Sequence, residues 1–198
     1  MATVIQIWNM ALAEVGNNPV ASLNEQSSSA RQCAIHYEQV RDEVLQAYPW
    51  GCASKRETLA LVGEGLVTNW QYAYGYPSDC LRSFGLVPPG LRNPTLAQTI
   101  PCEVATLSDV RVILTDASDP ELLYAWQQAD TTQFSALLTR AIYLLLAARI
   151  AYPLTKKLEI TQKCEQGYLR AVSEAAQSDM NESNPGPAPE VDYITVRY

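Results

Sequence analysis

Apolar residues recur three and four positions apart near the start of the chain, which is the spacing of one face of an α-helix. This pattern predicts a first helix from Thr3 to Val15, because Gly16 to Pro19 then supplies a left-handed helix end and a helix stop. It predicts a second helix from Ser28 to Tyr48, with serines 27 to 29 as sources of cap oxygens and Pro49 as the stop.

The helical pattern returns at about Thr132, and this third helix is apolar nearly all round as far as Tyr152-Pro153. A helix of this kind is buried on more than one side, so we expect it to be the central core element. A final amphipathic stripe begins near Leu154 or Thr155 and runs to about Ala176. The four helices can share one bundle-like core.

Between the second and third helices the pattern changes to short segments that are rich in β-branched and aromatic residues and are separated by Gly, Pro, Asn and Asp. The stretch from Pro88 to Pro94 cannot continue a central strand and is expected to be an exposed loop. Asp119-Pro120-Glu121 is expected to start a short helical turn through Trp126. The expected strands are Thr58 to Val62, Trp70 to Tyr74, Ser83 to Val87, Glu103 to Thr106 and Val110 to Leu114.

These elements predict an α+β fold that is mainly α, with a bundle-like body of about four helices, a small β insertion between the second and third long helices, and an extended C-terminal arm. The expected division is a helical body of residues 1–56 and 132–180, a β-rich insertion of residues 57–131, and a proline-rich tether with a terminal strand at 181–198. The terminal strand either adds to a sheet edge of this or a neighbouring subunit, or is a frayed terminus.

Length and composition favour one compact body, because 198 residues at 47% hydrophobic can bury one good core. The longest apolar run, Ala141 to Ala148, is bounded by Arg140 and Arg149 and is shorter than a membrane span requires. No secretory signal is visible at the N-terminus. We therefore expect a protein of the cytoplasm at first, with no membrane partner.

Charge and cysteine content narrow the chemistry further. The five cysteines have no close pair, which argues against a disulfide framework and a zinc site, and no metal or other cofactor is expected. The net charge of −7 opposes tight binding to nucleic acid, because neutralising phosphates needs clustered Lys and Arg. Contact with DNA is expected to be weak.

Residues that could carry catalysis do not form a recognisable site. His36 is the single histidine and has no nucleophile near it in the sequence, and Asp42 and Glu43 are helix neighbours whose side chains diverge. No phosphate-binding or metalloprotease motif is present. We therefore expect no catalytic residue, although a glycosidase pair of carboxylates from distant positions stays open.

Aromatic residues dominate the one part of the sequence that stands out. Trp70, Tyr72, Tyr74 and Tyr76 alternate along an expected strand and would share a face, which is either covered by the helical bundle, the interpretation we favour, or is an exposed platform for a partner.

Other residues in and around this region are expected to fix the fold. Trp50 is expected to anchor the junction of helix and sheet, Asp79 to accept hydrogen bonds in a turn, and Trp8 and Tyr37 to pack in the helical stripes. Lys55 and Arg56 are either solvated or face an acidic partner.

The order and spacing of these segments resemble the head-to-tail adaptor proteins of short-tailed bacteriophages, also called tail tubular protein A or tail accessory factor. The resemblance is strongest over residues 1 to 87. The segments that carry it are Ala11 to Gly16, Pro19 to Leu23, Ala30 to Tyr37, Arg41 to Leu45, Pro49 to Ala53 and Tyr74 to Arg82.

The resemblance implies a structural protein of the virion, at the neck of the tail, which is made in the host cytoplasm. It implies a ring of twelve copies that binds the portal protein and the tail nozzle, or tail tubular protein B, and through which genomic DNA passes without specific binding. An acidic lumen would suit this passage, because like charges repel. The candidate partner-binding residues are Lys55, Arg56, Pro88, Pro89, Arg92, Val191, Tyr193, Ile194, Val196 and Tyr198.

Two other functions stay open. One is a head-tail connector of a long-tailed phage, which is also an interaction protein built from helices and a β insertion. The other is a tail-associated hydrolase of cell-wall glycans, since some tail proteins of this kind have been credited with such activity.

Overall fold

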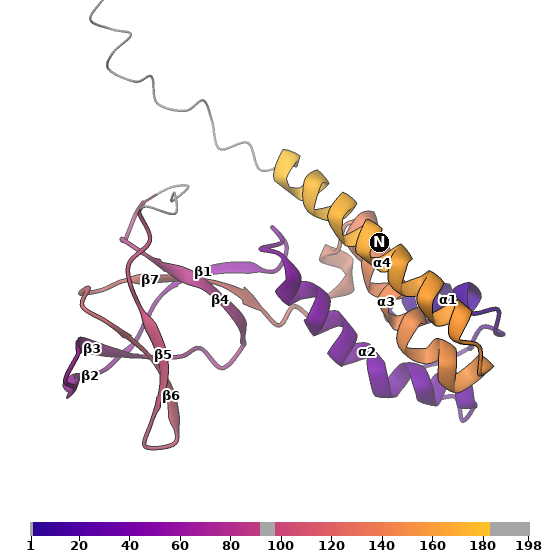
Figure 1. Cartoon of the computed structure of the whole chain (residues 1–198), viewed down its shortest axis with the longest axis horizontal. Helices are drawn as coiled ribbons and strands as arrows, with labels where there is room; N and C mark the ends of the chain where they lie inside the picture. The colour runs from indigo at the N-terminus through magenta and orange to yellow at the C-terminus, as the bar shows by residue number, and fades with distance from the viewer. Residues whose placement is uncertain (1, 92–97, 183–198) are drawn as a thin grey trace, which may run out of the picture.

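A computed structural model describes residues 2–91 and 98–182 of the chain (Figure 1). The helices gather at one end of the molecule and the strands at the other. The helices of this part are α1 (Val4–Glu14), α2 (Ser28–Ala47), α3 (Ala136–Thr155) and α4 (Leu158–Glu182), with a short 3-10 helix, η2 (Thr131–Gln133), before α3. The strands are β1 (Ser54–Thr58), β2 (Leu61–Val67), β3 (Trp70–Gly75), β4 (Cys80–Val87), β5 (Glu103–Leu107), β6 (Val110–Thr115) and β7 (Glu121–Trp126).

Side-chain caps fix where three of the helices begin. Thr3 and Gln6 form a reciprocal capping box at α1, and the hydroxyls of Ser27 and Ser135 accept hydrogen bonds from backbone amides of the first turns of α2 and α3. Gly16 follows α1 with a φ of +74°, which is the left-handed conformation expected at a helix end. The first two helices thus lie where the hydrophobic pattern predicts them.

Helix α3 lies at the centre of the helical body and packs against α1, α2 and α4. The expected stop at Tyr152-Pro153 is wrong, because α3 continues through Pro153 to Thr155. Pro153 leaves the carbonyl of Arg149 without its intrahelical donor, and the packing of α3 against α1, α2 and α4 outweighs that loss. Lys156, with a left-handed φ of 59°, ends the helix and donates from its amide to the carbonyl of Tyr152.

By length and composition alone, α3 could cross a membrane, since it spans 20 residues with a mean hydropathy of 1.4 over its most apolar window. Of that window, 61% is buried inside the fold, as is typical of a core helix. Its two arginines lie at the protein surface, where Arg140 pairs with Glu174 of α4 and Arg149 with Glu43 of α2. Burial among the other helices accounts for the apolar character of α3.

The expected fold class is wrong, because the strand content is much larger than a small insertion in a mainly α protein. Seven strands in the described residues form two antiparallel sheets, one of order β1-β7-β4 and one of order β2-β3-β6-β5. With four helices beside them, the fold is a mixed one of α and β. The expected extended arm covers residues 181–198. Its first two residues belong to α4, which ends at Glu182, and the rest lie outside the described residues.

Strand β7 occupies the segment for which the sequence predicts a helical turn. The expected helical turn from Asp119 to Trp126 is instead the central strand of the first sheet, bonded to β1 on one side and β4 on the other. Leu122 and Tyr124 alternate along it and are fully buried. Pairing on both sides and burial of these side chains outweigh the helix-start signal of Pro120, which follows a turn residue with positive φ.

The tyrosines of the aromatic run are covered by the other sheet and not by the helical bundle, which corrects the expectation. Tyr74 lies in a buried cluster with Leu86 of β4 and Leu122 and Tyr124 of β7. Trp70 does not share this cluster and packs near Ala73, Val112 and Leu114 in a second one. The sheets thus have small cores of their own beside the larger helical core.

Candidate partner-binding region at the helix-sheet junction

The segment after α2 anchors the helices at their border with the sheets. Trp50 is almost fully buried, and its indole Nε1 donates to the carbonyl oxygen of Val44 over 2.8 Å. The ring of Tyr48 meets the Trp50 ring edge to face, with centroids 5.0 Å apart. The amide of Gly51 lies 3.2 Å from both carboxylate oxygens of Asp179, which brings the end of α4 to the same place. Trp50 therefore lies where the sequence expected an anchor.

Lys55 joins strand β1 to the turn before β4. Its ammonium Nζ lies 2.6 Å from Oδ2 of Asp79 and 3.9 Å from the centre of the Trp126 ring. A cation over an indole face adds an attraction to that of the ion pair. Asp79, in the turn before β4, thus bonds to a distant strand, where the sequence suggested only local hydrogen bonds.

Tyr124 extends this contact inward. Its hydroxyl lies 2.8 Å from Oε2 of Glu57 and 3.2 Å from Oδ1 of Asp79, and a single proton can serve only one of them at a time. Burial and these carboxylates raise the pKa of Tyr124, so the phenol stays protonated and donates. The hydrogen bond from Lys55 is the main reason why the pKa of Asp79 lies below its ordinary value. The neutral hydroxyl of Tyr124 thus lies between the carboxylates of Glu57 and Asp79, and the Lys55 ammonium binds Asp79.

Arg56 holds the proline-rich loop after β4. Its guanidinium contacts the carboxylate of Glu121 and the carbonyl oxygen of Leu91, and Nη2 lies 3.1 Å from the carbonyl oxygen of Pro88. The rings of Pro88 and Pro89 are exposed. Arg56 therefore fixes the base of a loop whose exposed apolar rings can meet a partner.

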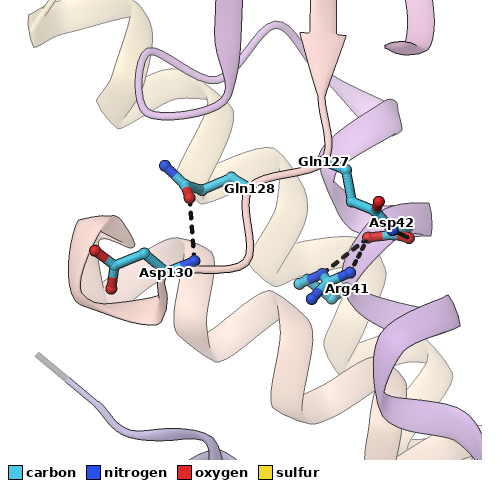
Figure 2. A network of polar contacts seen from close by, with 5 residues as sticks. All are labelled: Arg41, Asp42, Gln127, Gln128 and Asp130. Carbon is cyan, nitrogen blue, oxygen red and sulfur yellow. Dashed lines mark hydrogen bonds and ion pairs between the residues drawn. The ribbon is translucent and has the colours of Figure 1, made fainter. Parts of the chain in front are cut away.

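A network of polar side chains connects α2 with the chain that leaves β7 (Figure 2). Arg41, only 6% exposed, pairs with Asp42 at 2.8 Å, and the amide of Gln127 donates to the other carboxylate oxygen of Asp42 over 2.7 Å. The amide oxygen of Gln128 accepts from the backbone of Asp130, which in turn caps η2. These residues are not among the expected site residues, although Arg41, a charged residue within the apolar stripe of α2, was the sequence signal for the network.

Arg82 closes the other side of the junction. Its Nη1 donates to the carbonyl oxygen of Gln46 over 3.0 Å, which satisfies one of the free carbonyls at the end of α2. Its guanidinium also lies over the ring of Phe84, 5.6 Å from the centre. The start of β4 and the turn before it thus contact β1 through Asp79 and Lys55, and the end of α2 through Arg82.

The remaining expected anchors lie away from this junction. The rings of Trp8 and Tyr37 meet edge to face between α1 and α2, 6.3 Å apart. The hydroxyl of Tyr74 bonds to the backbone of the turn between β6 and β7, and Arg111 lies 3.9 Å from the centre of the Tyr76 ring. Of the candidate partner-binding residues, Arg92, Val191, Tyr193, Ile194, Val196 and Tyr198 lie outside the described residues.

The described residues contain no group of three or more His, Cys, Asp or Glu side chains that could hold a metal ion. All five cysteines are free thiols, and burial raises the pKa of Cys33 to about 12 and that of Cys52 to about 11. These thiols stay protonated at neutral pH and are poor nucleophiles and metal ligands.

The sequence was compared with models of known protein families and with curated proteins. No model of a known protein family matches the chain, and no curated protein matches its sequence. By its fold, the protein is a helical body with an extension of two sheets. Buried aromatic and polar contacts at the junction hold the two parts together.

Proposed function

We propose that this chain is a head-to-tail adaptor of a short-tailed bacteriophage. Copies of it would form a ring, of twelve subunits in the family that it resembles, between the portal protein and the tail nozzle. The ring would give the genome a conduit at the neck of the virion. The observation that carries the proposal is the set of ordered sequence segments by which the chain resembles this family.

The contacts at the junction support the proposal, because they give the distinctive segments a physical role. Trp50, Lys55, Asp79 and Arg82 all belong to or flank these segments and are all engaged in joining elements. A protein that transmits position from one partner to another needs such a fixed connection between the parts that touch each partner. The segments therefore make sense as the frame of an adaptor.

The shape of the molecule also fits a connecting role. Helices and sheets lie at opposite ends, so that each end is free to meet a different neighbour (Figure 1). The exposed proline loop, fixed by Arg56, lies at the sheet end. We propose that one end binds the portal and the other the tail nozzle.

The overall charge suits a DNA conduit. A net charge of −7 disfavours adhesion to phosphates, and a like-charged wall lets a nucleic acid slide past. A ring whose lumen was lined mainly by Lys and Arg would contradict this part of the proposal.

The carboxylates of Glu57 and Asp79 are the pair to consider for the alternative function as a glycan hydrolase. Glu57 and Asp79 both face the hydroxyl of Tyr124, and Asp79 also binds Lys55. A general acid and a nucleophile must face a substrate. These carboxylates instead satisfy side chains of their own protein, which favours the structural role.

Electron microscopy of the purified chain mixed with the portal of its own virus tests the proposal. We expect a ring of copies on one face of the portal, and light scattering should show a complex with several copies for each portal ring. A chain that fails to bind the portal under any condition would overturn the adaptor function. Turnover of cell-wall glycans that is lost in Glu57→Gln or Asp79→Asn, with the fold intact, would favour the hydrolase instead.

A further inference from the structure

Three large apolar side chains form a stripe along the outside of α4. Leu158, Leu169 and Met180 are 59%, 64% and 60% exposed. They are spaced eleven residues apart, which corresponds to roughly three helical turns, so they lie nearly in line along the helix. We call these three residues the α4 stripe.

The α4 stripe faces away from the core of its own subunit. The residues of α4 that are buried against the rest of the body are Cys164, Ala171 and Ala175. At about 100° per residue, the stripe lies on the order of 140° around the helix axis from these three residues. Packing among residues 2–91 and 98–182 of one subunit therefore does not cover it.

A groove lies on a different part of the helical body, beside α1 and the start of α3. Its volume is about 680 Å³. None of the side chains that line it is charged, and several are apolar. The lining residues are Ala2, Gln6, Asn9, Met10, Ala13, Phe134, Ala136, Thr139 and Tyr143.

We propose that the α4 stripe of one copy packs into the α1–α3 groove of a second copy. The occupant follows from the two surfaces together, because an uncharged hollow suits an apolar helix face and the same chain carries both. At about 100° per residue, Glu165 lies about 40° from the line of the stripe, and the other charged residues of α4 lie about 80° or more from it, with Glu159 and Asp179 nearer than Arg170 and Lys163. Leucine and methionine can thus enter the groove without carrying a row of charges into it.

The contact joins two different surfaces, so it is heterologous. A copy that uses its stripe on one neighbour keeps its groove free for another, and repetition gives a closed ring or an open chain. One helix face in one groove is a small interface, which is typical of weak association in solution. Closure of a ring would strengthen it, because each copy is then held on two sides.

This inference deepens the proposed ring and rests on it for its role in the virus. It can be tested without a portal. If the stripe and groove fail to meet but the chain binds the portal, the adaptor function stands and only this interface falls. If the interface forms but the portal is not bound, self-association stands and the adaptor function falls.

Two variants test the contact by complementation. Leu169→Arg places a charge in the stripe, and Ala13→Arg fills the groove, and both positions are exposed, so the fold is expected to survive. Each variant should be unable to use one surface while the other stays intact. Lys163→Ala, an exposed change on the flank of the same helix, is the matched control.

Sedimentation velocity over a concentration series gives the readout, with circular dichroism to verify folding. We expect the wild-type chain and Lys163→Ala to associate beyond dimers, with a dissociation constant of roughly 10–100 µM. Each arginine variant alone should raise that constant at least about tenfold. An equal mixture of the two should form dimers and stop there, because only one good stripe and one good groove remain.

Other outcomes would overturn the inference. They are a wild-type chain that stays monomeric at the highest concentration, arginine variants that associate like wild type, and a mixture that gains nothing over its components. A photo-crosslinker placed at residue 169 adds a direct readout. It should attach to peptides of residues 2–13 or 134–143 in another copy, whereas attachment elsewhere would identify a different partner surface.

Discussion

The ammonium of Lys55 lies 2.6 Å from a carboxylate oxygen of Asp79, although 24 positions separate the two residues in the chain. The contact joins β1 to the turn before β4, and both strands flank the central strand β7. The Trp126 ring of β7 lies against the same ammonium. Three segments of the chain thus meet around one positive charge.

A double-mutant cycle of Lys55→Met and Asp79→Asn should give a coupling free energy of about 0.5–1 kcal/mol. The value is modest because both side chains are more than a third exposed and water screens the pair. Urea denaturation of the four proteins measures it. A coupling of zero would mean that the contact does not hold the segments together.

The stability that Asp79 contributes should depend on pH. Its pKa is lowered in the folded state, so this contribution is fully present above the unfolded pKa of about 3.9 and is lost as the pH falls through the lower folded value. Urea unfolding of wild type and Asp79→Asn between pH 6 and pH 2 should show the difference shrink below about pH 4. A constant difference over the whole range would assign the effect of the substitution to packing.

Replacing Trp50 by phenylalanine should lower the free energy of unfolding by about 1–3 kcal/mol. The change removes the donor to the buried carbonyl of Val44 and leaves a gap in the helical core. Trp70→Phe is the matched control, since its indole donates to the exposed Glu103 at the protein surface. Equal losses in the two variants would argue against a special role for Trp50.

Gly16→Ala should destabilise the protein by about 1 kcal/mol, because a φ of +74° strains any residue with a Cβ atom. Apart from Gly16 and its two chain neighbours, no heavy atom of the described residues lies within 4 Å of the added methyl group, so the cost comes from the backbone conformation. Gly16→Asn should cost less, since asparagine tolerates the left-handed conformation better. Thermal unfolding of both variants checks this order, and a larger cost for asparagine would contradict it.

Asp42→Ala should cost about 2 kcal/mol or more, since it leaves the buried guanidinium of Arg41 without its carboxylate. Gln127→Ala removes only the contact between α2 and the chain after β7, and should cost less than about 1 kcal/mol. Chemical denaturation compares the two. Similar losses would mean that the link to Gln127 matters more than the charge of Arg41.

The helices could be predicted because their apolar residues recur at helical spacing over several turns, with hydroxyl caps at the start of α1, α2 and α3. The first two begin within one residue of their expected positions. The expected end of α3 at Tyr152-Pro153 is wrong because a local stop signal does not contain the packing of α3 in the helical core, which holds the helix as far as Thr155.

The sheets were harder to predict, since their strands are short and most face water on one side. Strand β1 holds Lys55, Arg56 and Glu57 in succession and has no apolar alternation to mark it. Its residues are held by partners far along the chain, such as Tyr124 opposite Lys55. No local pattern contains that information, which also explains why the roles of Lys55 and Arg56 could not be assigned.

The buried apolar residues of the sheets form clusters separate from the helical core. Cooperative unfolding depends on shared packing, so we expect the sheets and the helical body to open with different free energies. Amides of β3 and β6 can then exchange with solvent through an opening that leaves α3 intact. Under mechanical load, we expect the sheets of such a molecule to unfold before the helical body does.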